Sequence, residues 1–456
     1  MEIPNPHVFR EYDIRGVAER DFPSPFVREL GRALGTLYKR HGKQRVALCQ
    51  DCRLSSPRIT DALLSGMLST GIDVVDLGMG PSPLLYFGVF HLELDGGVMV
   101  TGSHNPADEN GFKIMLGQKT LGHAEVSELR RMVQEHDVVN ALDGQRTFRD
   151  LTAAYAGFVR GNIRLARHDL RFAIDAGNGA AGPLALAAME AMGLSPEVLL
   201  MEPDGNFPVH HPDPSQPANT DLLVRTVREL GLELGIAFDG DGDRIGVVDA
   251  KGRVLYGDEL LILLSRDLLA RRPGAAVLGE VKCSDKLYAD IAQHGGRPIL
   301  WKTGHSLIKA KMKEENALLA GEMSGHVFFA DRFFGFDDAI YAALRVLEIV
   351  AKSARPLHEL LDDLPTTFST PELRVPANDE TKFAIVDLVK RHYEATHEVV
   401  TVDGARIRFP DGWGLVRASN TQPVLVLRFE ASSEASLAAI RSEVETVVSR
   451  SSQAVL

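Results

Sequence analysis

Three stretches of the chain repeat one order of apolar and polar positions. Each begins with an apolar strand pattern, passes through a polar turn into an amphipathic helix pattern, and ends in a second strand led by glycine. The copies start near Arg45, Arg171 and Ala275. Alternation of strand and helix patterns is typical of α/β layers. The repeat therefore predicts three related α/β domains with mixed sheets.

The stretch after about residue 370 follows a different pattern. Its apolar positions indicate a helix, four strands and a closing helix, and Asp403-Gly404 is a hairpin signal between two of the strands. This order predicts a smaller C-terminal α+β domain. The elements are expected at residues 381–392, 398–402, 405–409, 414–418, 424–430 and 433–449, and the domains at residues 1–148, 149–253, 254–366 and 367–456.

Length and charge limit the possible functions. A chain of 456 residues is expected to divide into about three or four domains. Its formal net charge of -12 argues against a nucleic-acid partner, because such proteins usually present a basic face to the phosphate backbone. The longest aliphatic run, residues 260–264, is too short to span a membrane, and the N-terminus has no signal-peptide core. We therefore expect a cytoplasmic protein without a membrane partner.

The cysteines are Cys49, Cys52 and Cys283, too few for a disulfide scaffold in a chain of this length. Cys49 and Cys52 could form a redox pair or half of a zinc site, but the sequence has no second pair to complete tetrahedral Zn²⁺. We interpret them as two turn cysteines in a protein of a reducing compartment.

A polar loop follows a later apolar strand in each α/β copy, and a fourth loop joins two strands of the last domain. Loops at strand ends are where such folds place their chemistry. Four loops from four domains predict one central cleft. The loops are TGSHNP at residues 101–106, DGDGDR at 239–244, GEMSGH at 321–326 and RASNTQP at 417–423.

The DGDGDR loop places the carboxylates of Asp239, Asp241 and Asp243 at alternate positions between glycines. This concentration of like charge calls for a cation, and ligation by oxygen alone suits Mg²⁺ or Ca²⁺. An EF-hand requires Gly and Glu at its sixth and twelfth positions, where this chain has Arg244 and Ala250. Arg244 suits a substrate phosphate that bridges to the metal, an arrangement typical of phosphoryl transfer.

Ser103 lies in the tight TGSHNP loop beside His104, with Lys113 downstream, and is a candidate phosphoryl carrier. The sequence has no G-x-x-x-x-G-K-[ST] nucleotide loop, so a covalent phosphoserine is a more economical donor than ATP. The RASNTQP loop offers a cation, hydroxyls, an amide and backbone N–H groups to a phosphate monoester. Glu322 and Ser324 suit neighbouring sugar hydroxyls.

Other functions rest on single features. The GNGAAG turn at residues 177–182, with Glu197 near the ribose-binding distance, would fit an NAD-dependent oxidoreductase, and a plain strand-turn-helix fits it equally well. The aspartate loop alone would fit a Ca²⁺-binding module. A phosphatase could form an aspartyl phosphate at Asp239, but Asp243 stands where the DxDx[TV] pattern has Thr or Val.

Taken in order, these loops closely resemble those of the α-D-phosphohexomutase superfamily, and within it the bacterial phosphomannomutase/phosphoglucomutase group. The resemblance spans essentially the whole chain and also includes FREYDIRG at residues 9–16 and KTGHS at residues 302–306. It implies three related α/β domains and a smaller C-terminal domain around one cleft. It also implies a monomer or dimer that acts on small phosphosugars.

The resemblance assigns a role to each candidate residue. It implies that Ser103 carries the phosphoryl group, with Mg²⁺ held by a phosphoserine oxygen and the three aspartates, and that Glu322 and Ser324 bind sugar hydroxyls. The implied clamp on the phosphate that is not transferred is Arg417, Ser419, Asn420 and Thr421. Further implied substrate contacts are Tyr12, Arg15, Lys282 and His305. Candidates for proton transfer are His104, Lys113, Arg244 and His326.

The resemblance also implies a reaction sequence. The Ser103 phosphoryl group would pass to a hexose monophosphate, giving a 1,6-bisphosphate such as glucose 1,6-bisphosphate, which turns end for end and returns its other phosphoryl group to Ser103. Because water competes as the acceptor, we expect the C-terminal domain to move on binding and shield the site. Met323 in GEMSGH resembles the glucose/mannose group, and a phosphoglucosamine mutase is the alternative.

One stretch departs from the family pattern. Residues 49–52 read Cys-Gln-Asp-Cys, where relatives more often show Gly-Arg-Asp-x-Arg. We interpret this stretch as a peripheral turn that does not affect the chemistry.

Overall fold

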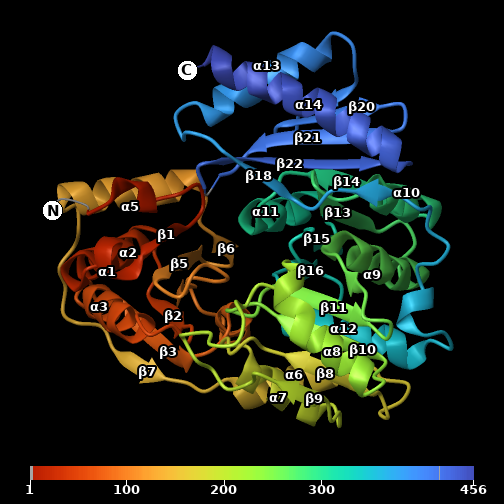
Figure 1. The fold of residues 1–456 in the computed structure, drawn as a ribbon. Helices are drawn as coiled ribbons and strands as arrows, with labels where there is room; N and C mark the ends of the chain where they lie inside the picture. Colours follow the sequence, from red (N-terminus) through yellow and green to blue (C-terminus); the bar gives the residue numbers. More distant parts are fainter. Residues whose placement is uncertain (1–3, 421, 456) are drawn as a thin grey trace.

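The computed structural model describes residues 4–420 and 422–455, and these residues form four sheets arranged around a common centre (Figure 1). In this view the N-terminal sheet lies on the left, the second at the bottom, the third on the right and the C-terminal sheet at the top. Four units around one centre confirm the predicted fold class of three α/β units and a smaller α+β unit.

The first sheet has the strand order β1-β5-β4-β2-β3-β7, with β6 beside β5. Strands β2, β3, β4 and β7 pair in parallel, whereas β5 runs antiparallel to β4 and β1, so the sheet is mixed. Its strands are β1 Ile14–Val17, β2 Arg45–Gln50, β3 Asp73–Met79, β4 Gly96–Val100, β5 Glu109–Leu116, β6 Lys119–Thr120 and β7 Arg146–Phe148. Its helices are α1 Ala18–Asp21, α2 Ser24–Arg40, α3 Ser56–Leu68, α4 Ser82–His91 and α5 His123–Glu135, after the short 3-10 turn η1 Pro6–Val8.

The second and third sheets repeat this plan with fewer strands, in the orders β12-β11-β10-β8-β9 and β14-β13-β15-β16. The second unit contains α6 Thr152–Asn162, β8 Phe172–Asp175, α7 Gly182–Ala191, β9 Glu197–Leu199, η2 Pro217–Thr220, α8 Asp221–Glu229, β10 Leu234–Phe238, β11 Ile245–Asp249 and β12 Val254–Leu255. The third contains α9 Gly257–Arg271, β13 Ala276–Glu280, α10 Asp285–Gln293, β14 Arg297–Trp301, α11 His305–Glu315, β15 Leu319–Gly321, β16 Val327–Phe329, α12 Ala339–Lys352 and η3 Leu357–Glu359.

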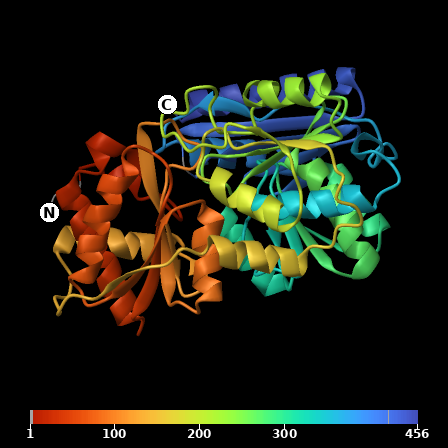
Figure 2. The same cartoon turned by 90° about the horizontal axis from the view of Figure 1, so that it is seen from below.

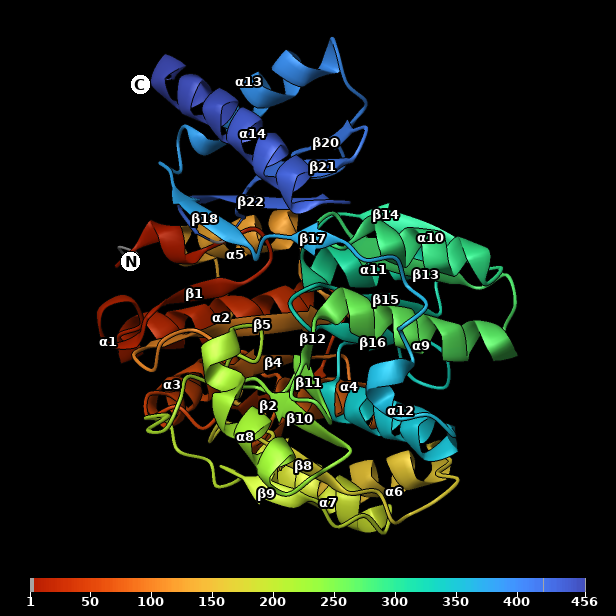
Figure 3. The ribbon, with the colours of Figure 1, turned by 45° about the vertical axis from the view of Figure 1, so that its right-hand side comes forward.

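The C-terminal sheet has the order β17-β22-β21-β20-β19, with β18 also paired to β22, and its pairs are antiparallel. The chain reaches it by a segment that runs past the third unit (Figure 3). The elements are β17 Phe368–Ser369, β18 Leu373–Pro376, α13 Lys382–Glu394, β19 Val399–Val400, β20 Ala405–Phe409, β21 Gly412–Ala418, β22 Val424–Ala431 and α14 Glu434–Ala454.

Three details of the sequence interpretation were wrong. The strand expected at residues 398–402 is only Val399–Val400, and the closing helix runs on to Ala454. Cys49 is not a turn residue, because it lies inside β2 with its side chain buried.

The three candidate loops of the α/β units occupy equivalent places. Each joins a strand of the parallel part of its sheet to an antiparallel neighbour: β4 to β5, β10 to β11, and β15 to β16. The strands before the loops are buried along their whole length, as strands covered on both faces are. The fourth loop joins β21 to β22. Repetition of one hairpin therefore brings three loops to the centre, and the loop of the C-terminal unit joins them there.

The hydrophobic core divides the molecule unequally. One cluster of buried side chains runs without a break through α4 of the first unit, the second unit and helices α9 and α12 of the third. The C-terminal unit has a separate cluster between its sheet and its two helices. From below, the first unit forms a block beside the others, joined by an extended stretch that leads to α6 (Figure 2). Among the described residues, no helix is long and apolar enough to cross a membrane.

Asp338 links the second and third units and titrates in an unusual range. Its carboxylate caps α12 by accepting from Tyr341 N–H at 2.8 Å and also accepts from the Tyr155 hydroxyl of α6 at 2.8 Å. Burial raises the pKa of Asp338 to about 7, although these hydrogen bonds oppose the rise. The pKa of an aspartate in the unfolded chain is about 3.9. The stability that the protonated Asp338 carboxyl contributes is therefore complete below about pH 4 and is lost as the pH rises through about 7.

Asp338→Asn keeps the shape of the cap and removes this titration. Relative to wild type, its Tm should therefore rise by about 1 to 3 °C between about pH 5 and pH 8. Differential scanning calorimetry measures this change, with Asp143→Asn at an exposed position as the control. Parallel Tm curves for Asp338→Asn and wild type would contradict the prediction.

Candidate active site

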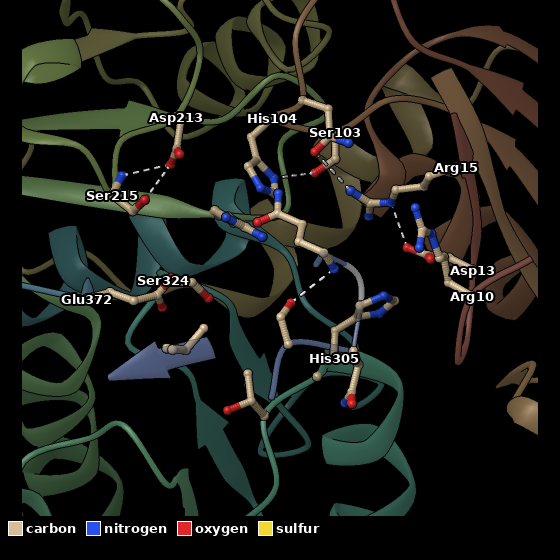
Figure 4. Close-up of a pocket in the computed structure, with 18 of the residues that line it drawn as sticks. Arg10, Asp13, Arg15, Ser103, His104, Asp213, Ser215, His305, Ser324 and Glu372 are labelled. Carbon is tan, nitrogen blue, oxygen red and sulfur yellow. Dashed lines mark hydrogen bonds and ion pairs between the residues drawn. The ribbon is translucent and has the colours of Figure 1, made fainter. Parts of the chain in front are cut away.

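A cavity of about 810 Å³ lies at the centre and is lined by residues of all four units. Figure 4 shows Arg15, Ser103, His104 and His305 at its wall. The three aspartates lie behind the wall with no exposed surface, and Thr421 lies outside the described residues. The predicted site residues that line the cavity are Tyr12, Arg15, Ser103, His104, Lys113, Arg244, Lys282, His305, Glu322, Ser324, His326, Arg417, Ser419 and Asn420.

Ser103 occupies the tip of the β4–β5 hairpin in an uncommon backbone conformation. Its φ is +51°, in the left-handed region that non-glycine residues rarely adopt. Its Oγ lies 3.1 Å from His104 Nδ1 and donates to Asp239 Oδ2 at 3.4 Å. The loop of the first unit therefore places a hydroxyl directly beside the aspartate loop of the second. A strained conformation at such a position is typical of functional sites.

The aspartate loop is held from two sides. The N–H groups of Asp243 and Arg244 donate to Asp239 Oδ1, each at 3.0 Å, and fold the loop on itself. From the first unit, Lys113 Nζ lies 2.6 Å from Asp241 Oδ2 and also contacts Asp243 Oδ2. Ser82, at the start of α4, donates to Asp241 as well.

The three carboxylates fit a metal ion. One oxygen from each of Asp239, Asp241 and Asp243 can be chosen so that all lie within 4.8 Å of one another. Asp241 Oδ1 and Asp243 Oδ1 are buried and accept no hydrogen bond from any described residue. Buried carboxylate oxygens without donors are costly, and an oxygen-only set is what a hard divalent cation prefers. The cluster can therefore hold a metal ion.

The electrostatic surroundings set the protonation of two candidate acid–base groups. Burial lowers the pKa of Lys113, but Asp241 and Asp243 outweigh this effect and raise the pKa well above its usual value. Burial, together with Arg244 and Arg15, holds the pKa of His104 well below its usual value. Near neutral pH, Lys113 is therefore a cation that cannot accept a proton, whereas His104 is neutral and can.

His326 lies in a chain of side-chain contacts that runs from Arg244 to Lys309. Its Nε2 accepts from Arg244 Nε at 3.0 Å, so the proton of the neutral ring is on Nδ1, which lies 3.0 Å from Asp337 Oδ2. Lys309 Nζ lies 3.1 Å from the other oxygen of Asp337. His326 therefore orients Arg244 toward the cavity, and its other ring nitrogen faces the carboxylate of Asp337.

Glu322 and Ser324 lie together with the KTGHS loop. Glu322 Oε1 accepts from Gly304 N–H at 2.6 Å, and Ser324 Oγ donates to Glu322 Oε2 at 3.4 Å. His305 is buried against the Tyr12 ring, and neither of its ring nitrogens has a hydrogen-bond partner among the described residues. A carboxylate, a hydroxyl and an imidazole without partners suit a ligand rich in hydroxyl groups.

The C-terminal unit contributes a cationic end to the cavity. Arg417 Nε donates to Asp403 Oδ2 at 2.9 Å, and the same oxygen accepts from Thr303 N–H of the third unit at 3.0 Å. Ser419 Oγ accepts from Gln422 N–H, which tightens the loop. The guanidinium of Arg417 is therefore anchored through Nε and presents its other N–H groups to the cavity.

Comparison with known proteins gives a consistent result. Four domain families of phosphoglucomutase/phosphomannomutase match residues 6–138 (alpha/beta/alpha domain I), 153–252 (domain II), 256–368 (domain III) and 372–447 (C-terminal domain). The chain is 45% identical to phosphomannomutase/phosphoglucomutase of Pseudomonas aeruginosa over 95% of its own length and 94% of the relative. The chain belongs to the α-D-phosphohexomutase superfamily.

Further relatives agree with this membership. The chain is 44% identical to phosphoglucomutase of Neisseria gonorrhoeae, over 97% of its own length and 96% of the relative. A crystal structure of a phosphoglucomutase/phosphomannomutase family protein from Burkholderia thailandensis superimposes with a TM-score of 0.92 at 41% identity, covering 98% of both chains. The whole architecture is thus that of the phosphohexomutase family.

Several cavity residues of this phosphohexomutase were missed by sequence reasoning. Glu372 lies outside every recognised motif, yet it accepts from Lys282 Nζ at 3.0 Å, and Lys282 lowers the pKa of Glu372 to about 2. Asp213 and Ser215 hydrogen-bond to each other and also line the cavity (Figure 4). The HHPDPS stretch at residues 210–215 was the available signal, because its prolines mark a loop and binding residues occur disproportionately on loops.

Residues 49–52, which depart from the family pattern, do not form the peripheral turn expected from the sequence. Asp51 and Arg53 are buried beside the Ser103 loop, and Asp51 Oδ2 accepts from Gly102 N–H at 3.1 Å. Cys52 Sγ contacts Asn178 O of the second unit, and burial raises the pKa of this thiol to about 12, so it is not a thiolate at neutral pH. A redox pair is therefore disfavoured.

The GNGAAG turn of the second unit packs against the aspartate loop. Ala180 N–H donates to Gly240 O at 2.9 Å, and a Cβ on Gly179 would stand 2.8 Å from the same oxygen. The turn follows β8 and precedes α7, as a dinucleotide-binding turn would, but the chain's own backbone lies against it. Gly179 therefore serves close packing onto the aspartate loop.

Asp239→Asn should separate two effects of this carboxylate: its repulsion by Asp241 and Asp243, and its part in binding a metal ion. Burial raises the pKa of Asp239, and Asp243 and Asp241 raise it further, so this carboxylate opposes folding when no cation is present. In EDTA the variant should melt about 1 to 3 °C above wild type, and millimolar Mg²⁺ should raise the Tm of the variant much less than that of wild type. Thermal melts of both proteins, with Asp143→Asn as the control, measure this. A full Mg²⁺ shift in Asp239→Asn would refute the assignment.

Proposed function

We propose that this protein is a phosphomannomutase/phosphoglucomutase, which interconverts hexose 1-phosphates and hexose 6-phosphates through a phosphoserine at Ser103 and a 1,6-bisphosphate intermediate. The observation that carries this proposal is one cavity that is lined by Ser103, beside the aspartate loop, by the Glu322–Ser324 pair and by Arg417. A carrier, a hydroxyl-binding pair and an anion clamp in one space are what such a reaction requires. Homology to proteins of this name supports the substrate class.

Phosphoryl transfer here depends on positioning and charge. Asp239, Asp241, Asp243 and a phosphoserine oxygen would hold Mg²⁺, and charge neutralisation of the transferring phosphoryl group is the chemistry that the bound ion supplies. In the forward step, the bond between phosphorus and Ser103 Oγ breaks and a bond to the sugar hydroxyl forms. Arg244 lines the same cavity and stabilises the negative charge on the equatorial oxygens of the phosphoryl group during its transfer.

His104 is the group that exchanges a proton with Ser103 Oγ. When the phosphoryl group leaves, the attacking sugar hydroxyl gives up a proton and Ser103 Oγ takes one up. When the bisphosphate returns its other phosphoryl group, Oγ gives up its proton and the freed sugar oxygen takes one up. His104 Nδ1 lies 3.1 Å from Ser103 Oγ, and its low pKa makes the neutral ring available as an acceptor. Lys113 is a cation paired with two aspartates, so its role is electrostatic.

The remaining groups tolerate two orientations of the bisphosphate. Arg417 and the RASNTQP loop bind whichever phosphate is distal, because a guanidinium and backbone N–H groups recognise any phosphate monoester. Glu322, Ser324 and His305 bind ring hydroxyls in the middle of the cavity. The intermediate can therefore turn without a second site.

Ser103→Ala should lower turnover by at least about a thousandfold, because the reaction loses its covalent carrier. The assay supplies Mg²⁺, catalytic glucose 1,6-bisphosphate and, in separate arms, glucose 1-phosphate, mannose 1-phosphate or glucosamine 1-phosphate. Ser127→Ala, at an exposed position of α5, is the control and should match wild type. Full activity of Ser103→Ala, or turnover of the glucosamine substrate alone, would contradict the proposed function.

The C-terminal unit should close on the bisphosphate. It has its own core, and its contact with the third unit combines a small apolar cluster, Val281, Trp413 and Leu415, with polar contacts such as that of Arg406 with Val281 O. It can therefore rotate without opening either core. Small-angle scattering with saturating glucose 1,6-bisphosphate and Mg²⁺ should show a smaller radius of gyration than the free protein. Arg417→Gln, which weakens the clamp, should reduce the compaction. An unchanged radius in wild type would argue against closure.

A further inference from the structure

Arg53 is the buried centre of the phosphoryl-carrier loop. It follows β2, its side chain has no exposed surface, and each of its five N–H groups has an acceptor. Two donors of the guanidinium reach Ser103 O at 2.8 Å and Asn105 O at 2.6 Å. The others reach Glu109 O at 2.9 Å, Pro106 O, and Asp51 Oδ2 at 3.2 Å. The loop from residue 103 to residue 109 is therefore wrapped around one cation.

Gly102 and Asp51 complete this arrangement. A Cβ on Gly102 would stand 2.5 Å from the guanidinium carbon, so only glycine lets the loop approach so closely. Asp51 Oδ2 bridges Gly102 N–H and Arg53 Nε, and Asp51 Oδ1 accepts from Ser56 Oγ. A buried ion pair with full hydrogen bonding and planar guanidinium geometry has few alternative arrangements. The loop conformation is therefore determined by Arg53 and its partners.

The second unit covers the other face of Arg53. The Phe207 ring centroid lies 5.3 Å from the guanidinium carbon. Gly205 passes so close that a Cβ there would stand 2.8 Å from the Arg53 Cα. Arg53 thus lies between the Ser103 loop and the unit that carries the aspartates.

We propose that Arg53 is a positioning residue for phosphoryl transfer, which holds Ser103 in its left-handed conformation and at its distance from the aspartate loop. This inference rests on the proposed function. Ser103 has a φ of +51°, and a residue in this region keeps that conformation only when its surroundings enforce it. Four of the carbonyl groups that enforce it point to Arg53. An error of about 1 Å in such a geometry costs about a hundredfold in rate.

Arg53→Lys tests the inference, because it keeps the charge but offers three donors from one atom in place of a planar fork of five. The kcat should fall by about a hundredfold, whereas the KM for hexose 1-phosphate should stay within about twofold, since Arg417 and Glu322 are untouched. Peptides covering residues 101–110 should exchange their amide hydrogens faster, while the rest of the first unit keeps its protection.

Arg58→Lys is the matched control. Arg58 belongs to the same unit and also donates to a backbone carbonyl, that of Phe22 at 2.8 Å, but it does not touch the Ser103 loop. Gly102→Ala provides a second route, because its Cβ pushes the loop off an intact Arg53; its kcat should fall in the same way. All rates are measured well below the Tm and normalised to the folded fraction.

The outcomes separate the two proposals. A wild type without turnover refutes the proposed function, and the exchange measurement then still tests the restraint on the loop. With an active wild type, a kcat of Arg53→Lys within about twofold of Arg58→Lys, or unchanged exchange at residues 101–110, overturns the role of Arg53. A loss that appears in KM rather than kcat also overturns it.

Discussion

Three carboxylates with no exposed surface at the tip of one hairpin are the constraint around which this molecule is built. Asp239, Asp241 and Asp243 cannot be buried together unless positive charge reaches them. Lys113 of the first unit supplies part of this positive charge, and Ser82 of the same unit donates a hydrogen bond to Asp241. Electrostatic compensation therefore requires the first two units to be docked, and the apolar core continuous from α4 into the second unit holds them so. The position of Ser103 follows from that docking.

The net charge of the chain conceals the character of its cavity. The protein as a whole is acidic, yet Arg15, Lys282, Arg244 and Arg417 all line the central space. Each is held by a carboxylate or an imidazole that fixes its direction, such as Asp13 for Arg15 and Asp403 for Arg417. Pre-oriented cations of this kind neutralise phosphate without reorganising during the reaction. Substrate recognition and transition-state stabilisation therefore draw on the same groups.

The sequence was sufficient to predict the parts of the site that lie in continuous motifs. The four loops, the repeat and the smaller last domain are local patterns, because a strand, a glycine-rich loop and a helix each depend on near neighbours. In the structure, the motif residues that it describes meet in one cavity, with the aspartates directly behind its wall. Repetition of one hairpin accounts for the equivalent places of three of these loops.

What could not be predicted depends on contacts between distant residues. Glu372 is an isolated carboxylate until Lys282 comes within 3.0 Å of it. The Asp51–Arg53 pair resembled a peripheral turn because its partners lie some fifty residues further along the chain. Protonation was equally hidden: Lys113 and His104 were equal candidates for proton transfer until their burial and neighbours assigned them opposite charge states. Contacts between residues far apart in the sequence thus determine the roles of side chains that local sequence patterns leave undecided.

The central claim is that a phosphoryl group resides on Ser103 and moves from there to the sugar. The most direct measurement follows a labelled phosphoryl group. Protein phosphorylated with ³²P-labelled glucose 1,6-bisphosphate is freed of small molecules, digested and examined by peptide mass spectrometry, and a parallel sample is mixed with unlabelled hexose 1-phosphate. The account predicts label on Ser103 alone, and its transfer to hexose bisphosphate at the rate of turnover. Label on Asp239, or label on Ser103 that the sugar does not remove, would contradict it.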